Sequence, residues 1–208
     1  MKAIIITPCL KSKIKDAVAI EQGDFVICAD TSFVKAKKEN IKIDLIIGDF
    51  DTGSPVPFPE GVDVIKFPIE KDDTDTMLAI KEAARRGYSQ IAVVGGLSGR
   101  LDHTYANIQS LAYGVKNGLD IRISDGDNEA FIMIPGRLHL PNKKGFSLSV
   151  FSYGENVNGL SLDGVKYPVQ GASITSFFPL GISNSIISKE AEISFSEGLL
   201  LIILSKLN

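Results

Sequence analysis

The sequence predicts an α/β domain with a largely parallel sheet, followed by a small all-β domain. Up to about Asp127, short runs rich in Ile and Val alternate with helix-like segments, as in the strand–helix units of a buried parallel sheet. After that residue, short β-rich stretches are separated by Gly, Pro and Asn, with no convincing helix between them. We therefore expect two domains, 1–127 and 128–208, which meet at the segment SDGDNE.

The first domain is expected to alternate strands with helices. Its candidate strands are KAIIIT, FVICAD, DLIIGD, VDVIKF, QIAVVGG and DIRISD. A lysine-rich helix is expected near residues 32–40, and longer helices over 74–86 and 102–117. The last of these carries an apolar stripe, formed by Tyr105, Ile108, Ala112 and Val115.

The second domain is expected to consist of strands alone. Its candidate stretches are FIMIPGRLHL, GFSLSVFSY, GLSLDGV, ASITSF, AEISFS and GLLLIIL. The residues that separate them are typical of turns, which favours antiparallel pairing. A small sandwich and a small barrel both satisfy this pattern.

The composition is that of a globular protein. With 208 residues, 44% of them hydrophobic, the chain is long enough for one ample core or two modest ones. Charged residues make up 23% and the formal net charge is −3, which argues against disorder and against a nucleic-acid partner. The run GLLLIIL is far shorter than the ~18 residues of a membrane span, and the N-terminus lacks a signal-peptide pattern. We expect a soluble protein with no membrane partner.

The cysteines indicate the redox setting. Cys9 and Cys28 are the only cysteines of the chain, and they form no CxxC pair. A zinc site or a disulfide framework therefore has little support. We expect a reduced, cytoplasmic protein.

Acidic and glycine residues gather where the strands of the first domain end. Open parallel sheets bind ligands just beyond the carboxyl ends of their strands, so these positions are candidates for a site. Asp30 follows one strand, and Asp49 and Asp51 follow the next. Two further segments carry the remaining candidates, which are Lys71, Asp72, Asp73, Asp75, Gly95, Gly96, Gly99, Arg100, Asp102 and His103.

These carboxylates predict a magnesium site. Acidic side chains that converge at one sheet edge repel one another unless a cation lies among them, and oxygen ligands suit Mg²⁺. Magnesium in proteins is commonly shared with substrate phosphates. The glycine-rich turn and Arg100 are then expected on the phosphate side of the same site, facing the positive end of the helix that starts near Asp102.

Each group also has a purely structural interpretation. The acids of KDDTD and Asp102 stand at helix starts, where acids are favoured as N-caps and as partners of the helix dipole. The acids of DFD could solvate a turn, the glycines could serve a loop, and His103 could lie on the surface. Independent caps and turns have no reason to gather at one edge of a sheet, and this coincidence favours a common site.

Familiar phosphate motifs are missing from the sequence. No GxxxxGK[ST] or GxGxxG occurs, so neither a P-loop nor the dinucleotide fingerprint is present. DFDT after an apolar strand resembles the nucleophile loop of HAD-type phosphatases. That family usually has Thr or Val four residues after the first aspartate, and here that residue is Gly53. A metal-dependent phosphohydrolase is therefore a distant second interpretation.

Three blocks, DLIIGDFDT, KDDTDTMLA and GGLSGRLDHTYANIQSL, resemble in order and spacing the catalytic-domain blocks of thiamine pyrophosphokinases. GVKYPV, LGISNS and ISFSEGLLLIIL resemble that family's thiamine-binding domain, so the resemblance covers nearly the whole chain. It implies a Rossmann-like three-layer domain followed by a β-sandwich, in a homodimer whose active sites are shared between subunits. It also implies a Mg²⁺-dependent transfer of the β,γ-pyrophosphate of ATP to the hydroxyl of thiamine, giving thiamine diphosphate and AMP.

The resemblance implies roles for individual residues. The magnesium ligands would be Asp49, Asp51 and Asp72. Catalysis would need these ligands together with Arg100 and Asp102. The residues around ATP and its phosphates would be Asp30, Lys71, Thr74, Asp75, Gly96, Arg100 and His103. Those around thiamine would be Gly181, Ser183 and Asn184.

Two segments depart from the family pattern. The family commonly reads ADGGA after its second strand, where this chain has ADTSF over residues 29–33, so the backbone near Asp30 is expected to differ. The family's SNE is SNS here, over residues 183–185, which removes one carboxylate near the thiamine end. A non-catalytic regulator that binds thiamine or a nucleotide is the alternative to an enzyme, and the intact acidic residues argue against it.

Overall fold

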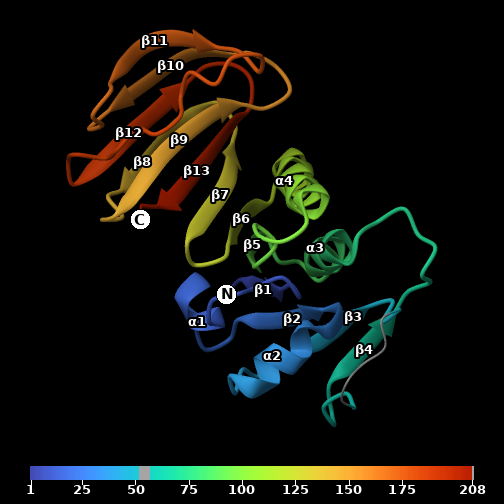
Figure 1. Ribbon diagram of the computed structural model, residues 1–208. Coiled ribbons are helices and arrows are strands. Elements are labelled where there is room, and N and C mark those ends of the chain that lie inside the picture. Colours follow the sequence, from blue (N-terminus) through green and yellow to red (C-terminus); the bar gives the residue numbers. More distant parts are fainter. Residues whose placement is uncertain (52–56, 208) are drawn as a thin grey trace. The chain divides into compact units, whose positions relative to one another are not determined.

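The computed structural model describes residues 1–51 and 57–207. The chain divides into two compact units, unit 1 (Met1–Gly126) and unit 2 (Asp127–Asn208) (Figure 1). Each unit encloses its own cluster of buried apolar side chains. The predicted fold class, a mostly parallel α/β region followed by an antiparallel all-β region, is confirmed.

Unit 1 is built on a parallel sheet. Its described strands are β1 (Ala3–Ile6), β2 (Phe25–Ala29), β3 (Leu45–Gly48), β4 (Asp63–Lys66), β5 (Gln90–Val94) and β6 (Asp120–Ser124). They lie in the order β4-β3-β2-β1-β5-β6, and neighbours run parallel. The chain adds strands on one side of β1 and then on the other, so the direction of winding reverses beside β1. Sheets of this kind bind ligands at the carboxyl ends of the strands next to such a reversal.

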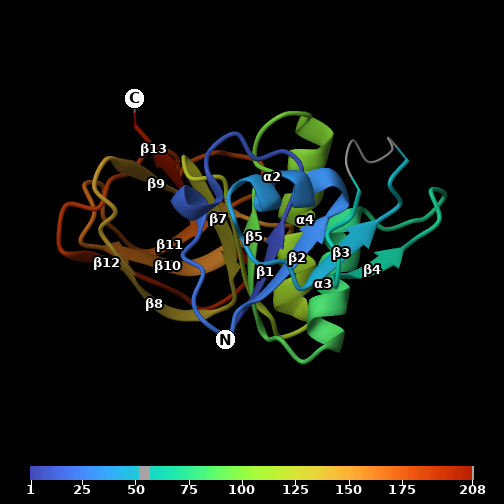
Figure 2. The same cartoon turned by 90° about the horizontal axis from the view of Figure 1, so that it is seen from below.

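Helices cover both faces of this sheet (Figures 1 and 2). Those on one side are α3 (Asp75–Arg85) and α4 (Leu101–Lys116), and those on the other are α1 (Ile14–Ala17) and α2 (Phe33–Lys38). Successive strand residues point to opposite faces, so a strand covered on both sides has no polar face. All of β1 is accordingly buried. On the α1 and α2 side, Ile4 and Ile6 pack with Ile14 and Phe33.

The inner face of α4 differs from the predicted stripe. Tyr105 is 59% exposed, so the prediction is wrong at that residue. The buried residues of the helix are small or polar for the most part, namely Asn107, Ser110, Leu111, Ala112 and Gly114. A Cβ added to Gly114 would lie 2.6 Å from Cγ2 of Ile121, so only a glycine lets α4 pack this closely on β6.

Unit 2 contains antiparallel strands that pack face to face. They are β7 (Asn128–Met133), β8 (Gly136–Pro141), β9 (Phe146–Ser152), β10 (Val157–Asp163), β11 (Val169–Ile174), β12 (Glu190–Phe195) and β13 (Leu200–Lys206). One sheet has the order β11-β10-β12-β8, and in the other β13 lies between β7 and β9. Leu148 and Ile202 from one sheet and Leu160 and Ile193 from the other belong to the same core, which makes the unit a sandwich.

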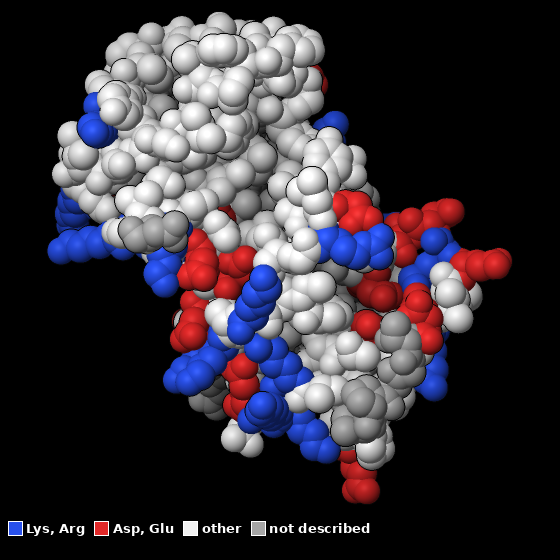
Figure 3. All heavy atoms as spheres, in the orientation of Figure 1, with Lys and Arg blue, Asp and Glu red and all other residues white. Residues whose placement is uncertain are grey.

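The two units differ in surface character. On the face drawn in Figure 3, charged side chains gather on unit 1, and the visible surface of unit 2 carries few. Large apolar side chains are exposed on both units, and in unit 2 five of them lie within residues 177–187, namely Phe177, Phe178, Leu180, Ile182 and Ile187. In the part of the chain that the structure describes, none of the helices has the length and apolar character needed to cross a membrane.

Candidate active site

A cavity of about 490 Å³ lies at the carboxyl ends of the strands of unit 1. Segments that are far apart in the sequence form its walls, from the ends of β1, β2 and β3 to the first turns of α3 and α4. The candidate residues that line it are Asp30, Asp49, Asp51, Lys71, Asp73, Thr74, Asp75, Gly96, Arg100 and His103. Asp72 and Asp102 are not among the lining residues. The fold thus brings most of the predicted site residues of unit 1 together.

Asp30 reaches the cavity through an unusual backbone. It follows β2 with φ 48°, a left-handed conformation that is uncommon for a residue with a side chain and is concentrated at functional sites. The neighbouring strand leaves room for it, because a Cβ on Gly48 would lie 3.0 Å from Cα of Asp30. In ADTSF, Ser32 donates a 2.8 Å hydrogen bond to the carbonyl of Ile6, and Phe33 is fully buried. The residues that replace the family's ADGGA pattern are therefore accommodated by packing in the core.

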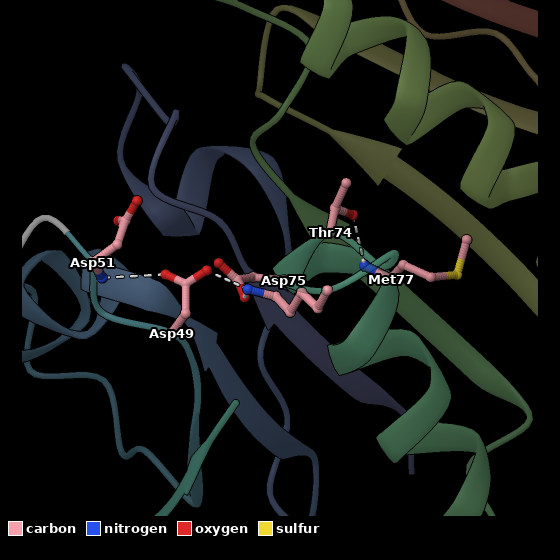
Figure 4. Close-up of polar contacts among 6 residues, drawn as sticks. Asp49, Asp51, Thr74, Asp75 and Met77 are labelled. Atoms are coloured by element: carbon pink, nitrogen blue, oxygen red, sulfur yellow. Dashed lines mark hydrogen bonds and ion pairs between the residues drawn. The ribbon is translucent and has the colours of Figure 1, made fainter. Parts of the chain in front are cut away.

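The DFD turn directs two carboxylates to the same cavity. Phe50, between them, has φ 55° and packs edge-on against Phe58, with the ring centroids 5.0 Å apart. The backbone N–H of Asp51 donates a 3.2 Å hydrogen bond to Oδ1 of Asp49 (Figure 4). The aromatic ring therefore anchors the turn while Asp49 and Asp51 line the cavity. Gly53, which separates this turn from the HAD pattern, lies outside the described residues.

The start of α3 decides which acid of KDDTD points into the cavity. Thr74 is the N-cap, and its hydroxyl accepts a 3.1 Å hydrogen bond from the N–H of Met77 (Figure 4). Asp75 is then the first residue of the helix and lines the cavity, with its side chain 23% exposed. Asp72 is exposed and lies outside the lining. The geometry therefore favours Asp75 over Asp72 as a member of the carboxylate cluster.

Lys71 lies among these carboxylates. Its Nζ donates a hydrogen bond to Oδ2 of Asp49 and lies 3.3 Å from Oδ1 of Asp75. The side chains of Lys71 and Asp49 are 14% and 13% exposed, so the ion pair is largely shielded from water. Asp49 follows β3 and Asp75 begins α3, so one ammonium group joins two separate elements of the fold.

The cluster holds more negative charge than Lys71 neutralises. Burial raises the pKa of Asp30, and the charges of Asp49 and Asp51 raise it further. Burial also raises the pKa of Asp75 against the pull of Lys71. The hydrogen bond from Lys71 lowers the pKa of Asp49. Burial disfavours the charged form of Lys71. Hydrogen bonds to Asp49 and Asp75 outweigh this effect, so the pKa of Lys71 is raised. Oδ1 of Asp30 is buried without a hydrogen-bond partner, whereas the buried Oδ1 of Asp75 has Nζ of Lys71 as its ion-pair partner.

The donor set fits a hard cation, although the side chains are arranged around Lys71. No group of three His, Cys, Asp or Glu side chains within residues 1–51 and 57–207 is placed to hold a metal ion. The lining carboxylates nevertheless offer only oxygen donors, carry excess negative charge and include one buried oxygen, Oδ1 of Asp30, without a hydrogen-bond partner. These are the properties of a site for Mg²⁺, which prefers carboxylates and shares its remaining positions with water and phosphate.

The loop after β5 carries Gly95, Gly96 and Gly99, and its backbone conformation requires glycine. Gly95 and Gly96 have φ values of 92° and 81°, and a Cβ on Gly95 would lie 2.5 Å from Oγ1 of Thr7. A Cβ on Gly96 would collide with the side-chain amide of Asn107, which donates a 3.0 Å hydrogen bond to the carbonyl of Gly96. Asn107 is 7% exposed and lines the cavity. Sequence patterns do not single it out, although it lies four residues after His103 and so on the same face of α4.

Arg100 stands where the glycine loop meets α4. It is the N-cap residue of the helix and lines the cavity with a side chain that is 74% exposed. Its Nε and Nη2 contact the two carboxylate oxygens of Asp102 at 3.1 and 2.5 Å. This pairing raises the pKa of Arg100 and lowers that of Asp102. Asp102 therefore orients the guanidinium group, and His103, one residue further, lines the cavity itself.

The residues that the resemblance implies for thiamine lie in unit 2. Gly181 packs against β9 so closely that a Cβ would collide with the carbonyl of Val150. Ser183 is exposed, with φ 59°. Asn184 is 7% exposed, and its side-chain amide accepts a 3.0 Å hydrogen bond from the N–H of Tyr167 and donates a 2.9 Å bond to the carbonyl of the same residue. Asn184 therefore holds the loop in place, while the neighbouring Ser183 is exposed.

Comparison with known proteins identifies the family of the chain. The model of the thiamin pyrophosphokinase catalytic domain matches residues 17–123, and the model of the thiamin pyrophosphokinase vitamin B1 binding domain matches residues 137–200. The chain belongs to the thiamine pyrophosphokinase family. The family predicted from the motifs is thereby confirmed.

Individual members of the thiamine pyrophosphokinase family resemble the chain as well. A curated thiamine pyrophosphokinase of Bacillus subtilis is 37% identical over 142 residues, which span 67% of this chain and 65% of that relative. A crystal structure of thiamine pyrophosphokinase from the same organism superposes with a TM-score of 0.89 at 26% identity and covers all of both chains. The enzyme structure from Geobacillus thermodenitrificans gives a TM-score of 0.86 at 26% identity, over 99% of this chain and 98% of that one.

Proposed function

We propose that this protein transfers the β,γ-pyrophosphate of ATP to the hydroxyl of thiamine, giving thiamine diphosphate and AMP. The observation that carries the proposal is the cavity of unit 1, where the acids of DFD and KDDTD and the glycine loop with Arg100 line one space. These are the three blocks that resemble the catalytic domain of the family. A regulator that only binds its ligands has less need of a cluster of carboxylates in its cavity, and this favours an enzyme.

The magnesium ligands are proposed to be Asp30, Asp49, Asp51 and Asp75. All four line the cavity, and Asp30 contributes a buried oxygen that lacks a hydrogen-bond partner. Asp72, which the resemblance implies as a ligand, is left out because it is exposed and does not line the cavity. Bound Mg²⁺ supplies positive charge that offsets the charge of the ATP phosphates.

The phosphates of ATP are proposed to lie against the glycine loop and the start of α4. Backbone N–H groups at a helix N-terminus attract anions. The N-cap residue of α4, Arg100, makes no side-chain cap, while the N–H of His103 donates a 2.9 Å hydrogen bond to Oδ1 of Asp102. Arg100 offers a planar fork of donors that matches phosphate oxygens, and Asp102 limits the orientations of that fork. Thr74 and His103 complete the polar wall. These groups position the reactants and stabilise charge, which is the main requirement of phosphoryl-type transfer.

Thiamine is proposed to bind at the loop that carries Gly181 and Ser183, in a homodimer whose active sites each use both subunits. The loop is held rigidly by Asn184. The exposed apolar side chains before and after it, including Phe177 and Ile187, support a surface that a second copy covers.

The proposed reaction is tested by the release of AMP from ATP and Mg²⁺, with and without thiamine. We expect AMP to form only when thiamine is present, and thiamine diphosphate to form in equal amount. Phosphate release without thiamine would instead indicate a phosphohydrolase. Binding of either ligand without any turnover would indicate a regulator. Asp49→Asn is the matched control, since it keeps the shape of the side chain and removes its charge.

The shared site is tested by mixing two inactive variants. One variant carries Asp49→Asn, and the other carries Ser183→Ala together with Asn184→Ala. A mixed two-fold dimer rebuilds one intact site, so activity should return to about a quarter of wild type when subunits exchange statistically and the sites are independent. No recovery after exchange has been verified with a tagged subunit would place both half-sites on one chain.

We also propose a reducing, cytoplasmic setting for this protein. Cys9 and Cys28 are both free. Burial raises the pKa of the Cys28 thiol to about 12, which keeps it in the unreactive protonated form. Titration with a thiol reagent under denaturing conditions, after purification without a reductant, should detect both thiols.

A further inference from the structure

Lys71 occupies the position between carboxylates where a cation is needed. Its ammonium group contacts Asp49 and Asp75, and their side chains are 13% and 23% exposed. Oδ1 of Asp30, which is buried without a hydrogen-bond partner, belongs to the same cluster. The protein therefore carries its own positive charge inside the group of acids proposed to bind magnesium.

An ammonium group and a divalent cation compete for such a position. Mg²⁺ binds carboxylate oxygens at about 2.0–2.1 Å and demands a nearly octahedral arrangement, which an ammonium group in contact with the same oxygen obstructs. Two cations about 4 Å apart also repel each other strongly where water is largely excluded. Binding of the metal to Asp49 and Asp75 therefore requires Lys71 to leave them.

We propose that Lys71 is an internal counter-ion that competes with magnesium for Asp49 and Asp75. This inference rests on the proposed metal site and concerns its regulation. In the metal-free protein, the ammonium group offsets part of the negative charge of the cluster and keeps the end of β3 close to the start of α3. When magnesium binds, the ammonium group is released into the cavity that Arg100 also lines, where it meets the phosphates of ATP.

The competition makes metal binding weak without nucleotide and tighter with it. Without ATP, the metal must displace Lys71 and leave its charge without a partner. With ATP, the phosphates provide a new partner for the displaced ammonium group, so the same displacement costs less. Lys71 thus couples the binding of the metal to the binding of the nucleotide.

The test measures the affinity of the purified protein for Mg²⁺ alone, without nucleotide and at constant ionic strength. Lys71→Met removes the competing charge and keeps a side chain of similar length. We expect its dissociation constant for Mg²⁺ to fall by on the order of tenfold relative to wild type. The tightening that ATP gives to wild type should shrink in the variant. Displacement of Mn²⁺, followed by electron paramagnetic resonance, gives the affinities independently of turnover.

Lys81→Met is the matched control. Lys81 pairs with Asp73 at 2.6 Å in the same acidic segment, but its side chain is 41% exposed and contacts neither Asp49 nor Asp75. The substitution removes the same charge near the site without touching the proposed competition. Its affinity for Mg²⁺ should stay within about twofold of wild type, since exposed charges are screened. Equal tightening in both variants would overturn the proposal, because it would show a general effect of net charge.

Thermal stability gives a second measurement. Without its counter-ion, the carboxylate cluster repels itself, so metal-free Lys71→Met should melt at a lower temperature than wild type and gain more from saturating Mg²⁺. If Lys71→Met does not fold without the metal, Lys71→Gln removes the charge and keeps a hydrogen-bond donor for Asp49. Unchanged or weaker Mg²⁺ affinity in the folded variant would refute the competition.

The outcomes separate this inference from the proposed function. If wild type neither binds Mg²⁺ nor forms AMP from ATP and thiamine, the proposed function fails. If wild type is active and binds Mg²⁺, but Lys71→Met binds it no more tightly, only the role of Lys71 as a competitor fails.

Discussion

Unit 1 and unit 2 differ in the groups that surround their candidate binding residues. Unit 1 gathers carboxylates, a lysine and a glycine loop in one cavity, whereas unit 2 exposes apolar side chains such as Phe177 on its loops. The difference follows from architecture. A parallel sheet covered on both faces leaves only its strand ends for chemistry, so polar groups from many segments converge there. A sandwich offers faces and loops instead, and its exposed apolar groups call for a covering partner or ligand.

The largest expected effect falls on the carboxylates of unit 1. Asp75→Asn should lower kcat/KM by at least about 100-fold, because it removes a charge from the proposed metal site. Asp72→Asn, three residues earlier but exposed, should stay within a few-fold of wild type. Steady-state kinetics under saturating Mg²⁺ compare the two. The reverse order would restore Asp72 as the ligand and remove Asp75.

Arg100 is expected to show a smaller effect within the same unit. Arg100→Lys keeps the charge but loses the fork that contacts both oxygens of Asp102, so kcat/KM for ATP should fall on the order of tenfold. Arg137→Lys is the control in unit 2, where the arginine pairs with Glu192 on the surface and should tolerate the change. Unchanged kinetics for Arg100→Lys would make Arg100 a solvated loop residue.

Two neighbours in unit 2 should respond differently to loss of their polar groups. Asn184→Ala removes buried hydrogen bonds to the backbone of Tyr167, so it should lower the free energy of unfolding by about 1–3 kcal/mol. Ser183→Ala should leave stability nearly unchanged and raise KM for thiamine. Thermal melts and thiamine kinetics on both variants separate the two roles. A destabilised Ser183→Ala, or a stable Asn184→Ala, would contradict the assignment.

The smallest expected effect concerns Glu82, which lies toward the end of α3 and does not line the cavity. Hydrogen bonds from Arg85 and Arg86 lower the pKa of Glu82 to about 2, from 4.5. Because the pKa is lower in the folded state, the carboxylate stabilises the fold above about pH 4.5, and this contribution is lost as the pH falls toward about 2. Glu82→Gln should therefore cost less than about 1 kcal/mol at pH 7. Denaturant unfolding measured over a range of pH should show that the free energies of unfolding of the variant and wild type become equal in acid.

Much of the fold could be predicted because its signals are local. Buried strands read as short runs of Ile and Val, and each predicted strand of the first half matches one of β1 to β6. The termini of α3 and α4 agree within one residue with the predictions. The short α1 could not be predicted, because its four residues are too few to show a helical period of apolar residues. FIMIPGRLHL was expected as one stretch, but the chain turns at Ile134 and Pro135 to form β7 and β8.

The site could be predicted only in part, because side-chain direction depends on packing. Asp72 and Asp75 look alike in KDDTD, and only the capping by Thr74 decides which of them faces the cavity. Asn184 was assigned to thiamine from the family pattern, and its hydrogen bonds within unit 2 cannot be seen in one sequence. Tyr105 suggested an apolar face, whereas α4 packs through small residues that carry no hydrophobic signal.

Gly48 directly precedes Asp49 and packs against the backbone of Asp30. A Cβ at this position would lie 3.0 Å from Cα and 3.2 Å from N of Asp30, so the backbone of Asp30 would have to move by a few tenths of an ångström. A side chain at position 48 is therefore expected to shift Asp30 relative to Asp49, even though both aspartates are kept.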